Sequence, residues 1–540
     1  QVIPLEQARS QVQEIAGGAK TAKVTAFEPY VKWMLLQPEE NRWDFAYYDM
    51  QVDLYQQQGI RWVPFLIAGP AYATPGWFKE SKESVFARCL EHNEQTRTQS
   101  IWNPHLRKRV ETLVEQFAAH FDPGQIQSLL LGISGDFGET IYTVSGNGWT
   151  YIWDGEYHQH AGWWCGDEYA GRDFQRKMQE QYQQIENLNA AWGSHFAGFA
   201  EVKPLIPTNA EPAAGEAVSR RARLDMIRWY RQSMTDYAEF WLQTCKKYLP
   251  KVPVVLCTGG DGSAMLGADF SQQAILAARY GYGMRITNEG SNYADNFAGT
   301  RWVGSACRNL GTYFGYEPAG EVNERGIAAR IYNATASGAD ELFVYDNPPA
   351  GERGAIYTRY HSMLVKREPK VPVAVFLSKT AQELGLLTDL YPHAAVFRDY
   401  TDFDYLDESL IEQGFLDRYQ VLVWTDGAVT EEKTLQQIEK WALAGGSLYC
   451  YIQPQTVEGR LWKLPAKDFA VSPSSLASFF EQIALSHAGL IPDGRADKVY
   501  WTRFKNDSVL ILNFSDQVYE INNHKIEPGG IGEFQPDGKN

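Results

Sequence analysis

The chain has 540 residues, 44% of them hydrophobic, which is enough to build sizeable cores in more than one domain. Its formal net charge of -16 and its pI near 5.2 exclude a generally basic surface of the kind that binds nucleic acid or anionic membranes. The sequence has no apolar stretch of about 18 residues, so no membrane span is predicted. The 6 cysteines lack Cys-x-x-Cys spacing, which argues against a zinc ribbon and against a dense disulfide framework.

From residue 24 to about residue 346, short apolar runs alternate with helical patterns, a rhythm typical of βα units. Strands are predicted at 23–27, 62–67, 86–90, 129–133, 252–257, 284–287, 312–316 and 342–345. Helices are predicted at 47–58, 104–121 and 174–188. This pattern predicts an α/β fold, a (β/α)8 TIM barrel, over residues 1–365.

A second βαβ rhythm follows the barrel. Its predicted strands read VPVAVFL, YQVLVWTD and GGSLYCYI, with an amphipathic helix at 431–443. They predict a flavodoxin-like, doubly wound α/β domain over residues 366–488. Because no G-x-G-x-x-G follows a strand there, no dinucleotide cofactor is expected. The tail alternates like antiparallel strands around a turn at 505–507, which predicts a small C-terminal antiparallel β-domain over residues 489–540.

Two acidic segments stand where barrel strands are predicted to end. Residues 129–140 read LLLGISGDFGET, and residues 311–317 read GTYFGYE. A carboxylate directly after a buried apolar run loses hydration, which is an unfavourable way to end a purely structural strand. The carboxyl ends of barrel strands form the active face of this fold, and paired carboxylates there suggest glycoside hydrolysis.

Longer phrases along the chain carry a family resemblance. They are WMLLQPEENRWDF at 33–45, AYATPGWF at 71–78, ENLNAAWGSHF at 186–196 and GYEPAGEVNERGIAARIYNATASGADELFVYD at 315–346. These phrases resemble glycoside hydrolase family 42, the bacterial β-galactosidases of clan A, which have a barrel, a flavodoxin-like middle domain and a small β-domain. The resemblance implies a retaining glycosidase without a cofactor. It also implies a homo-oligomer, a trimer by family analogy or else a dimer.

The resemblance assigns the nucleophile to Glu317, in GYEP. The acid/base of the family is a Glu in an Asn-Glu pair ending strand four, and this chain has no Asn-Glu there. If Gly138-Glu139 takes the place of that pair, the acid is Glu139; if ISGDFG is aligned instead, it is Asp136. Glu139 is favoured for its longer reach. Glu289 follows another predicted strand and is either a rival of Glu317 or a supporting residue.

The missing Asn bears on the substrate, because in this clan it typically binds the sugar 2-hydroxyl. Its loss implies a divergent relative, and an algal, sulfated galactan of the carrageenan type, attacked from the chain end, is a candidate substrate. The Gly-Glu strand is also similar to the inverting β-amylases. The alternatives are therefore an inverting glucan hydrolase and a non-catalytic carbohydrate-binding protein. A saccharide partner fits a periplasmic or secreted protein, with a cytoplasmic location as the alternative.

Further residues are predicted to contact substrate, because aromatic rings stack on sugars and polar groups at strand ends bind hydroxyls. They are Glu28, Asn103, Trp149, Trp163, Trp164, Asn288 and Tyr316. Asn103 fits a helix cap before Pro104 equally well. His158 and His160 are spaced i, i+2, but they lack a convincing third ligand, so no metal site is predicted.

Overall fold

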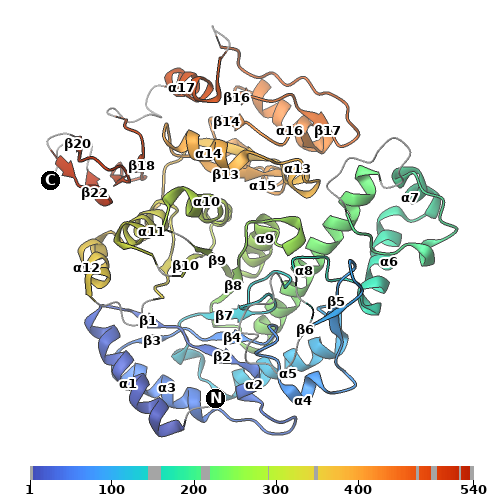
Figure 1. Cartoon of the computed structure of the whole chain (residues 1–540), viewed down its shortest axis with the longest axis vertical. Helices are drawn as coiled ribbons and strands as arrows, with labels where there is room; N and C mark the ends of the chain where they lie inside the picture. Colours follow the sequence, from blue (N-terminus) through green and yellow to red (C-terminus); the bar gives the residue numbers. More distant parts are fainter. Residues whose placement is uncertain are drawn as a thin grey trace. The chain divides into compact units, whose positions relative to one another are not determined.

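The computed structural model describes residues 4–143, 158, 160–207, 219–289, 291–320, 322–345, 351–469, 473–487, 495–521 and 524–534, with the backbone alone at 288, 289, 295 and 319. Trp149 lies outside the described residues. The chain divides into two compact units, Gln1–Arg285 and Ile286–Asn540 (Figure 1). In the described part of the chain, no helix has both the length and the apolarity needed to cross a membrane.

The first unit is built on four parallel strands, in the order β2-β4-β7-β8. They are β2 (Tyr30–Lys32), β4 (Phe65–Ile67), β7 (Leu129–Gly132) and β8 (Val254–Thr258). Two shorter strands, β1 (Ala26–Phe27) and β3 (Arg61–Trp62), pair in parallel just before β2 and β4. Pro29 and Pro64 lie at the two breaks, where a residue without an N–H cannot donate to the ladder. Every residue of β7 and β8 is buried, as expected for parallel strands covered on both faces.

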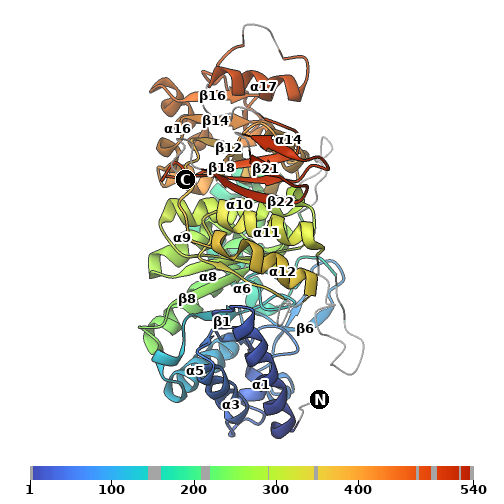
Figure 2. The same ribbon diagram turned by 90° about the vertical axis from the view of Figure 1, so that its left-hand side faces the viewer.

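The first unit also contains nine α-helices in its described residues. They are α1 (Leu5–Thr21), α2 (Trp33–Leu36), α3 (Ala46–Gln57), α4 (Gly76–Lys79), α5 (Pro104–His120), α6 (Glu168–Tyr182), α7 (Ile185–Trp192), α8 (Arg220–Tyr248) and α9 (Phe270–Tyr280). Helices α1 and α3 lie side by side and share a core in which Ala8, Val12 and Ala16 pack near Leu54 and Tyr55 (Figure 2). The small residues at spacings of four let the two helices approach closely.

The prediction of a barrel strand at 86–90 is wrong. Strand β5 (Phe86–Arg88) pairs antiparallel with β6 (Gln95–Gln99), and this hairpin is separate from the parallel sheet. The physical reason is the polar sequence of β6, QTRTQ, whose first residues alternate between solvent and interior. A strand with one solvent-exposed face suits a surface hairpin. A strand of a TIM barrel is instead covered on both faces.

The second unit begins within β9 (Gly283–Glu289) and continues with strands in the order β11-β10-β9. The remaining elements of this part are β10 (Phe314–Ala319), β11 (Glu341–Leu342), α10 (Tyr293–Leu310), α11 (Glu324–Ala336) and α12 (Gly351–Tyr360). Strand β10 pairs in parallel with β11, with Tyr316 opposite Leu342. The parallel pairing is the one expected of consecutive βα units.

A separate four-stranded parallel sheet follows in the same unit, in the order β13-β12-β14-β16. Its strands are β12 (Val373–Leu377), β13 (Asp404–Asp407), β14 (Val421–Trp424) and β16 (Ser447–Cys450), and a short parallel pair joins β15 (Val429–Thr430) to β17 (Gln455–Thr456). Its helices are α13 (Lys379–Glu383), α14 (Leu390–Arg398), α15 (Glu408–Glu412), α16 (Glu432–Leu443) and α17 (Leu476–Ser486). The first strand lies between the second and third, which confirms the predicted flavodoxin-like winding.

The chain ends in antiparallel strands, as predicted. Strands β18 (Val499–Arg503), β19 (Val509–Asn513) and β22 (Gly530–Phe534) form one sheet, and β20 (Tyr519–Ile521) pairs with β21 (His524–Ile526). The turn between β18 and β19 contains Asp507 at φ +62°, a left-handed conformation that Asp tolerates well. This turn falls at the position predicted from the sequence.

Candidate active-site residues

Glu139 stands at the end of a tight turn that follows β7. The N–H of Ile133 donates to the carbonyl of Gly138 at 3.1 Å, so the chain closes on itself directly after the strand. Gly138 has φ +119°, and a Cβ at this position would lie 2.8 Å from Cζ of Phe65. A side chain there would clash with an aromatic ring of β4, so only glycine fits. The sequence Gly-Glu is therefore imposed by the packing of the turn.

The Glu139 side chain is held from several sides. The N–H of Phe137 donates to Oε2 of Glu139 at 3.1 Å. Gly259, directly after β8, leaves room for the side chain, because a Cβ there would approach Cγ of Glu139 to 3.0 Å. The next residue is fixed to β8, since the N–H of Thr140 donates to the carbonyl of Cys257 at 2.7 Å. The carboxyl group is half-buried and preorganised at the ends of two strands.

Asp136 lies in the same turn and is 9% exposed. Its neighbour Phe137 is exposed, and the hydroxyl of Tyr72 donates to the Phe137 carbonyl at 3.3 Å. The turn thus contains both of the carboxyl groups that the sequence offers as the acid. The choice of Glu139 over Asp136 stays a prediction.

Glu317 is the fourth residue of β10 and is 6% exposed. The hydroxyl of Thr287, on β9, donates to Oε2 of Glu317 at 3.0 Å. This hydrogen bond fixes the orientation of the Glu317 carboxylate. Asn288 and Glu289 follow Thr287 on the same strand, and their predicted roles stay predictions.

The side chain of Tyr316, the residue before Glu317 on β10, points to the opposite side of the sheet. Successive strand residues point to opposite sides of a sheet, so the ring of Tyr316 lies on the side away from Glu317. Its hydroxyl lies near Thr300 of α10 and Asn333 of α11, and burial raises the pKa of Tyr316 to about 12. Its ring is fully buried. This position does not support the predicted contact with substrate and gives Tyr316 a packing role between strand and helices.

Glu28 belongs to a buried ion pair. Its Oε2 lies 2.5 Å from Nη1 of Arg285, and the two side chains are 5% and 0% exposed, respectively. The guanidinium also lies over the ring of Phe65, 5.3 Å from its centroid. Phe65 is the ring that excludes a side chain at Gly138. A chain of contacts therefore joins Glu28 and Arg285 to the turn that carries Glu139.

Asn103 is the N-cap of α5, the alternative that the sequence left open. Its Oδ1 accepts from the N–H of His105 at 3.0 Å, and its Nδ2 donates to the carbonyl of Glu83 at 2.8 Å. The side chain is fully buried. The oxygen and the nitrogen of the Asn103 side-chain amide are therefore both hydrogen-bonded within the protein.

The variant Asn103→Ala is therefore expected to lose about 1–2 kcal/mol of unfolding free energy, the usual effect of removing a helix cap, without a change in KM. Urea unfolding and steady-state kinetics on the same preparations measure the two quantities. Asn103→Ser, which keeps a cap acceptor, is the matched control and should lose less. If Asn103→Ala instead raises KM and leaves the unfolding free energy unchanged, then Asn103 binds substrate.

Trp163 and Trp164 pack a loop against α8. The N–H of Trp164 donates to the hydroxyl of Tyr230 at 3.1 Å, and the ring of Trp163 lies 5.0 Å from that of Tyr230. Both rings are buried, so neither offers an open face on which a sugar could stack. Their position supports a packing role and not the predicted substrate contact.

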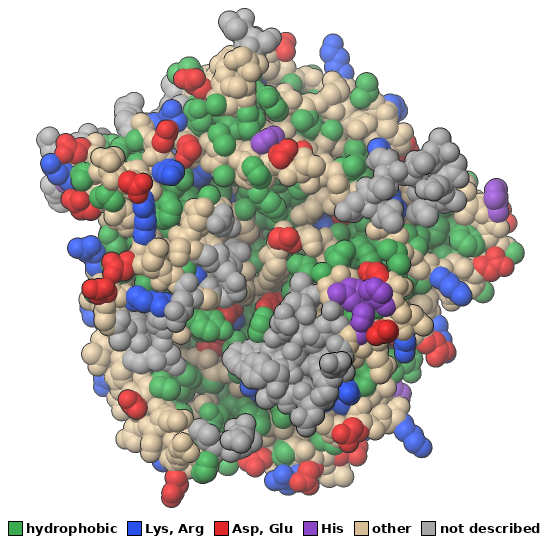
Figure 3. Space-filling view, viewed as in Figure 1, with side chains coloured by type: hydrophobic (Ala, Val, Ile, Leu, Met, Phe, Trp, Pro, Cys, Tyr) green, Lys and Arg blue, Asp and Glu red, His purple; other side chains and the backbone are tan. Residues whose placement is uncertain are grey.

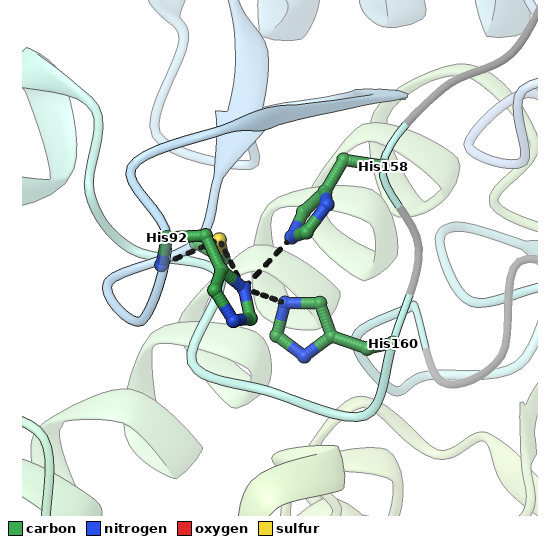
Figure 4. A group of neighbouring side chains, drawn as sticks. His92, His158 and His160 are labelled. Atoms are coloured by element: carbon green, nitrogen blue, oxygen red, sulfur yellow. Dashed lines mark hydrogen bonds between the residues drawn. The ribbon is translucent and has the colours of Figure 1, made fainter.

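Sequence reasoning missed one group of side chains. Cys89, His92, His158 and His160 lie together in the first unit, with one potential ligand atom of each within 4.8 Å of all the others (Figure 4). The signal in the sequence was the spacing Cys-x-x-His at 89–92 combined with His-x-His at 158–160. The prediction of no metal site considered only the second pair, and the structure places Cys89 and His92 beside it.

The chain is similar in sequence to a known family of glycoside hydrolases. The family model of glycoside hydrolase family 42, described as beta-galactosidase, matches residues 2–274. This range contains Glu139 and spans half of the 540 residues. The chain belongs to glycoside hydrolase family 42. The family predicted from the sequence phrases is thereby confirmed.

Among curated relatives of this family 42 protein, the thermophilic beta-amylase of Thermoanaerobacterium thermosulfurigenes is 24% identical over 212 residues, which cover 36% of this chain and 37% of the relative. The chain therefore matches little more than a third of that relative's length.

Two solved structures resemble the family 42 chain over most of its length. The polyextremophilic beta-galactosidase of the Antarctic haloarchaeon Halorubrum lacusprofundi has a TM-score of 0.74 at 14% identity, covering 98% of this chain and 97% of that one. The apo exo-carrageenase GH42 from Bacteroides ovatus has a TM-score of 0.65 at 12% identity, covering 95% and 80%. At such identities the likeness shows the fold. It confirms a TIM barrel followed by a flavodoxin-like domain and a small β-domain.

Proposed function

We propose that this family 42 protein is a retaining glycoside hydrolase that releases β-linked galactose units from the end of an oligosaccharide or polysaccharide. The observation that carries the proposal is the family match, which contains Glu139 in the turn after β7. Glu317, on β10, supplies the second carboxylate that this chemistry requires. The names of the similar proteins, beta-galactosidases and an exo-carrageenase among them, support a galactoside as substrate.

The mechanism divides into two displacements. In the first, an oxygen of Glu317 attacks the anomeric carbon while Glu139 gives its proton to the glycosidic oxygen, so the C–O bond breaks and a glycosyl-enzyme forms. In the second, Glu139 takes a proton from water, the water oxygen attacks the anomeric carbon, and the bond to Glu317 breaks. Two inversions at one carbon restore the β configuration.

Gly138 bears on the substrate. The position before the acid has φ +119° and no room for a Cβ, so an Asn that binds the 2-hydroxyl cannot stand there. Either another group binds this hydroxyl, or the substrate differs near it. We propose a modified galactan, a sulfated algal polymer of the carrageenan type, as the natural substrate. A polymer of this kind would be met in the periplasm or outside the cell.

A second candidate is an inverting hydrolase of α-linked glucan. The observation that favours it is the match to a curated beta-amylase over 212 residues. Such an enzyme uses two carboxyl groups about 6.5–9.5 Å apart, with water attacking the sugar directly. The two candidates differ in substrate and in the anomer released.

The test is hydrolysis of a panel of aryl β-glycosides, carrageenan and galactan oligosaccharides, and maltooligosaccharides, with proton NMR recording the first anomer released. We expect β-galactose, or a modified β-galactose, from a β-linked substrate. The α-anomer from that substrate would overturn retention, and turnover of maltooligosaccharides alone would establish the second candidate. Binding to galactan without turnover of any substrate would establish a non-catalytic carbohydrate-binding protein.

A further inference from the structure

Lys32 is the last residue of β2 and stands at the carboxyl edge of the parallel sheet in the first unit. Its register partner on β4 is Ile67, which in turn pairs with Gly132 at the end of β7. Lys32 is therefore level with the strand end from which the turn with Glu139 begins. The carboxyl ends of barrel strands form the active face of this fold, so a charged side chain at this position is a candidate for contact with substrate.

The side chain of Lys32 lies on the same face of the sheet as the turn that carries Glu139. Residues two apart on a strand share a face, so Lys32 is on the side of Tyr30. The ring of Tyr30 packs edge-on against Phe65 of β4, with the two ring centroids 5.3 Å apart. The ring of Phe65 in turn lies against Gly138, the residue before Glu139. Lys32 and the turn are therefore on one face of the sheet and at the same edge of it.

Tyr72 connects Lys32 to this turn. Nζ of Lys32 lies 5.2 Å from the centroid of the Tyr72 ring, within the range of a cation–π contact. The hydroxyl of the same ring donates to the carbonyl of Phe137 at 3.3 Å, two residues before Glu139. One phenol ring thus spans the space between the ammonium group and the turn. Because a pyranose ring is of similar size, a sugar unit bound at Glu139 can present a substituent to Lys32.

The ammonium group of Lys32 is partly buried without an acidic partner. Burial lowers the pKa of Lys32, and among the described residues no carboxylate offsets this effect. Lysine ammonium groups seldom lose hydration in this way unless an anion pairs with them. The backbone N–H of Lys32 donates to the hydroxyl of Tyr48 at 3.0 Å, which fixes the base of the side chain. An anion bound beside the ammonium group would compensate for its partial burial.

The charge of the whole chain does not provide recognition of an anion. The formal net charge is -16, and on the face drawn in Figure 3 the Lys and Arg side chains are scattered among acidic ones. A surface of this kind does not attract a polyanion at long range. Selection of an anionic sugar therefore depends on single cations placed at the active face, where they can donate charge-assisted hydrogen bonds.

We propose that Lys32 binds a sulfate ester of the substrate and sets a preference for sulfated over neutral galactosides. The ammonium group donates hydrogen bonds to the sulfate oxygens and supplies the opposite charge at the active face. The contact with Tyr72 keeps the ammonium group beside the turn that carries Glu139. This inference rests on the proposed function, and it names the residue that selects the modified galactan.

The kinetic experiment compares 4-nitrophenyl β-galactoside with its 4-sulfate and 6-sulfate esters. The wild-type chain should favour one ester over the neutral galactoside. Lys32→Met should lower the ratio of the two kcat/KM values, ester over neutral, by about 10–100-fold, the effect of losing a hydrogen bond to a charged group. Lys32→Arg should retain most of the ratio, and Lys108→Met, at an exposed position of α5, should leave it unchanged. A ratio that Lys32→Met does not alter, or a wild-type preference for the neutral galactoside, would overturn the proposal.

A second measurement needs no turnover, so it separates failure of this inference from failure of the proposed function. Wild type and Lys32→Met are titrated in a calorimeter with galactose, galactose 4-sulfate, galactose 6-sulfate and galacturonic acid. A sulfated sugar should bind the wild type more tightly than galactose, and this gain should shrink in Lys32→Met and at high salt, which screens the contact.

Equal affinity of the wild type for galactose and both sulfates would overturn the inference, as would a gain that Lys32→Met preserves. If galacturonic acid alone shows the gain that depends on Lys32, the bound anion is a carboxylate and not a sulfate ester. Absence of turnover of every aryl β-galactoside, with the sulfate gain intact, would instead overturn the proposed activity alone.

Discussion

Replacing Glu317 with glutamine is expected to lower kcat/KM on an aryl β-galactoside by at least about 10³-fold, because the amide cannot form the glycosyl-enzyme. The amide oxygen can still accept the hydrogen bond from Thr287, so the fold around β10 should persist. Steady-state kinetics, with a thermal melt as a check on folding, measure the loss.

Replacing Glu139 with glutamine should act differently. The general acid contributes about 10²–10⁴-fold, and its absence matters most when the leaving group is poor. Glu139→Gln should therefore retain much of its first-step rate on dinitrophenyl galactoside and lose it on lactose-like substrates. A comparison of the two leaving groups separates an acid/base from a residue that only binds sugar.

Azide identifies the two roles by product. Glu317→Ala with azide should form the α-galactosyl azide, because azide replaces the nucleophile on its face of the sugar. Glu139→Ala with azide should form the β-galactosyl azide by attack on the glycosyl-enzyme. Asp136→Asn and Glu289→Gln are the matched comparisons. If Asp136→Asn shows the leaving-group pattern and Glu139→Gln does not, the acid is Asp136.

The buried strands were predictable because their sequences admit few other structures. LLLG at 129–132 and VAVFL at 373–377 are continuous apolar runs, and both are buried parallel strands. The prediction of a barrel strand at 86–90 was wrong because the sequence FARCL, with four apolar residues, fits a short surface strand as well as a barrel strand. Only the pairing partner distinguishes the two, and a single sequence does not reveal it.

The candidate site was predictable in part. A carboxylate at the end of an apolar run reveals its position, so Glu139 and Glu317 could be named from the sequence. Adjacent strand residues face opposite sides of a sheet, so a Glu317 that faces the substrate implies a Tyr316 that faces the helices. The cysteine and histidine cluster depends on residues 66 and 68 positions apart, which only the fold brings together.

Breaking the ion pair between Glu28 and Arg285 is expected to have a large effect on stability. Both side chains are buried, and removing one charge of a buried ion pair costs about 3–5 kcal/mol. Glu28→Gln should lower the unfolding free energy by this amount in urea denaturation. The exposed pair of Glu39 and Arg42 is the matched control, and Glu39→Gln should cost no more than about 1 kcal/mol.

The double variant Glu28→Leu with Arg285→Met tests the reason for that loss. Replacing both charges with apolar side chains of similar volume removes both buried charges, so stability should return to within about 1–2 kcal/mol of the wild type. Activity need not return with it, since Arg285 also lies over Phe65, the ring that packs against Gly138 before Glu139. If Glu28→Gln instead leaves unfolding unchanged and raises KM, then Glu28 is the substrate contact that the sequence predicted and the ion pair is not a structural requirement.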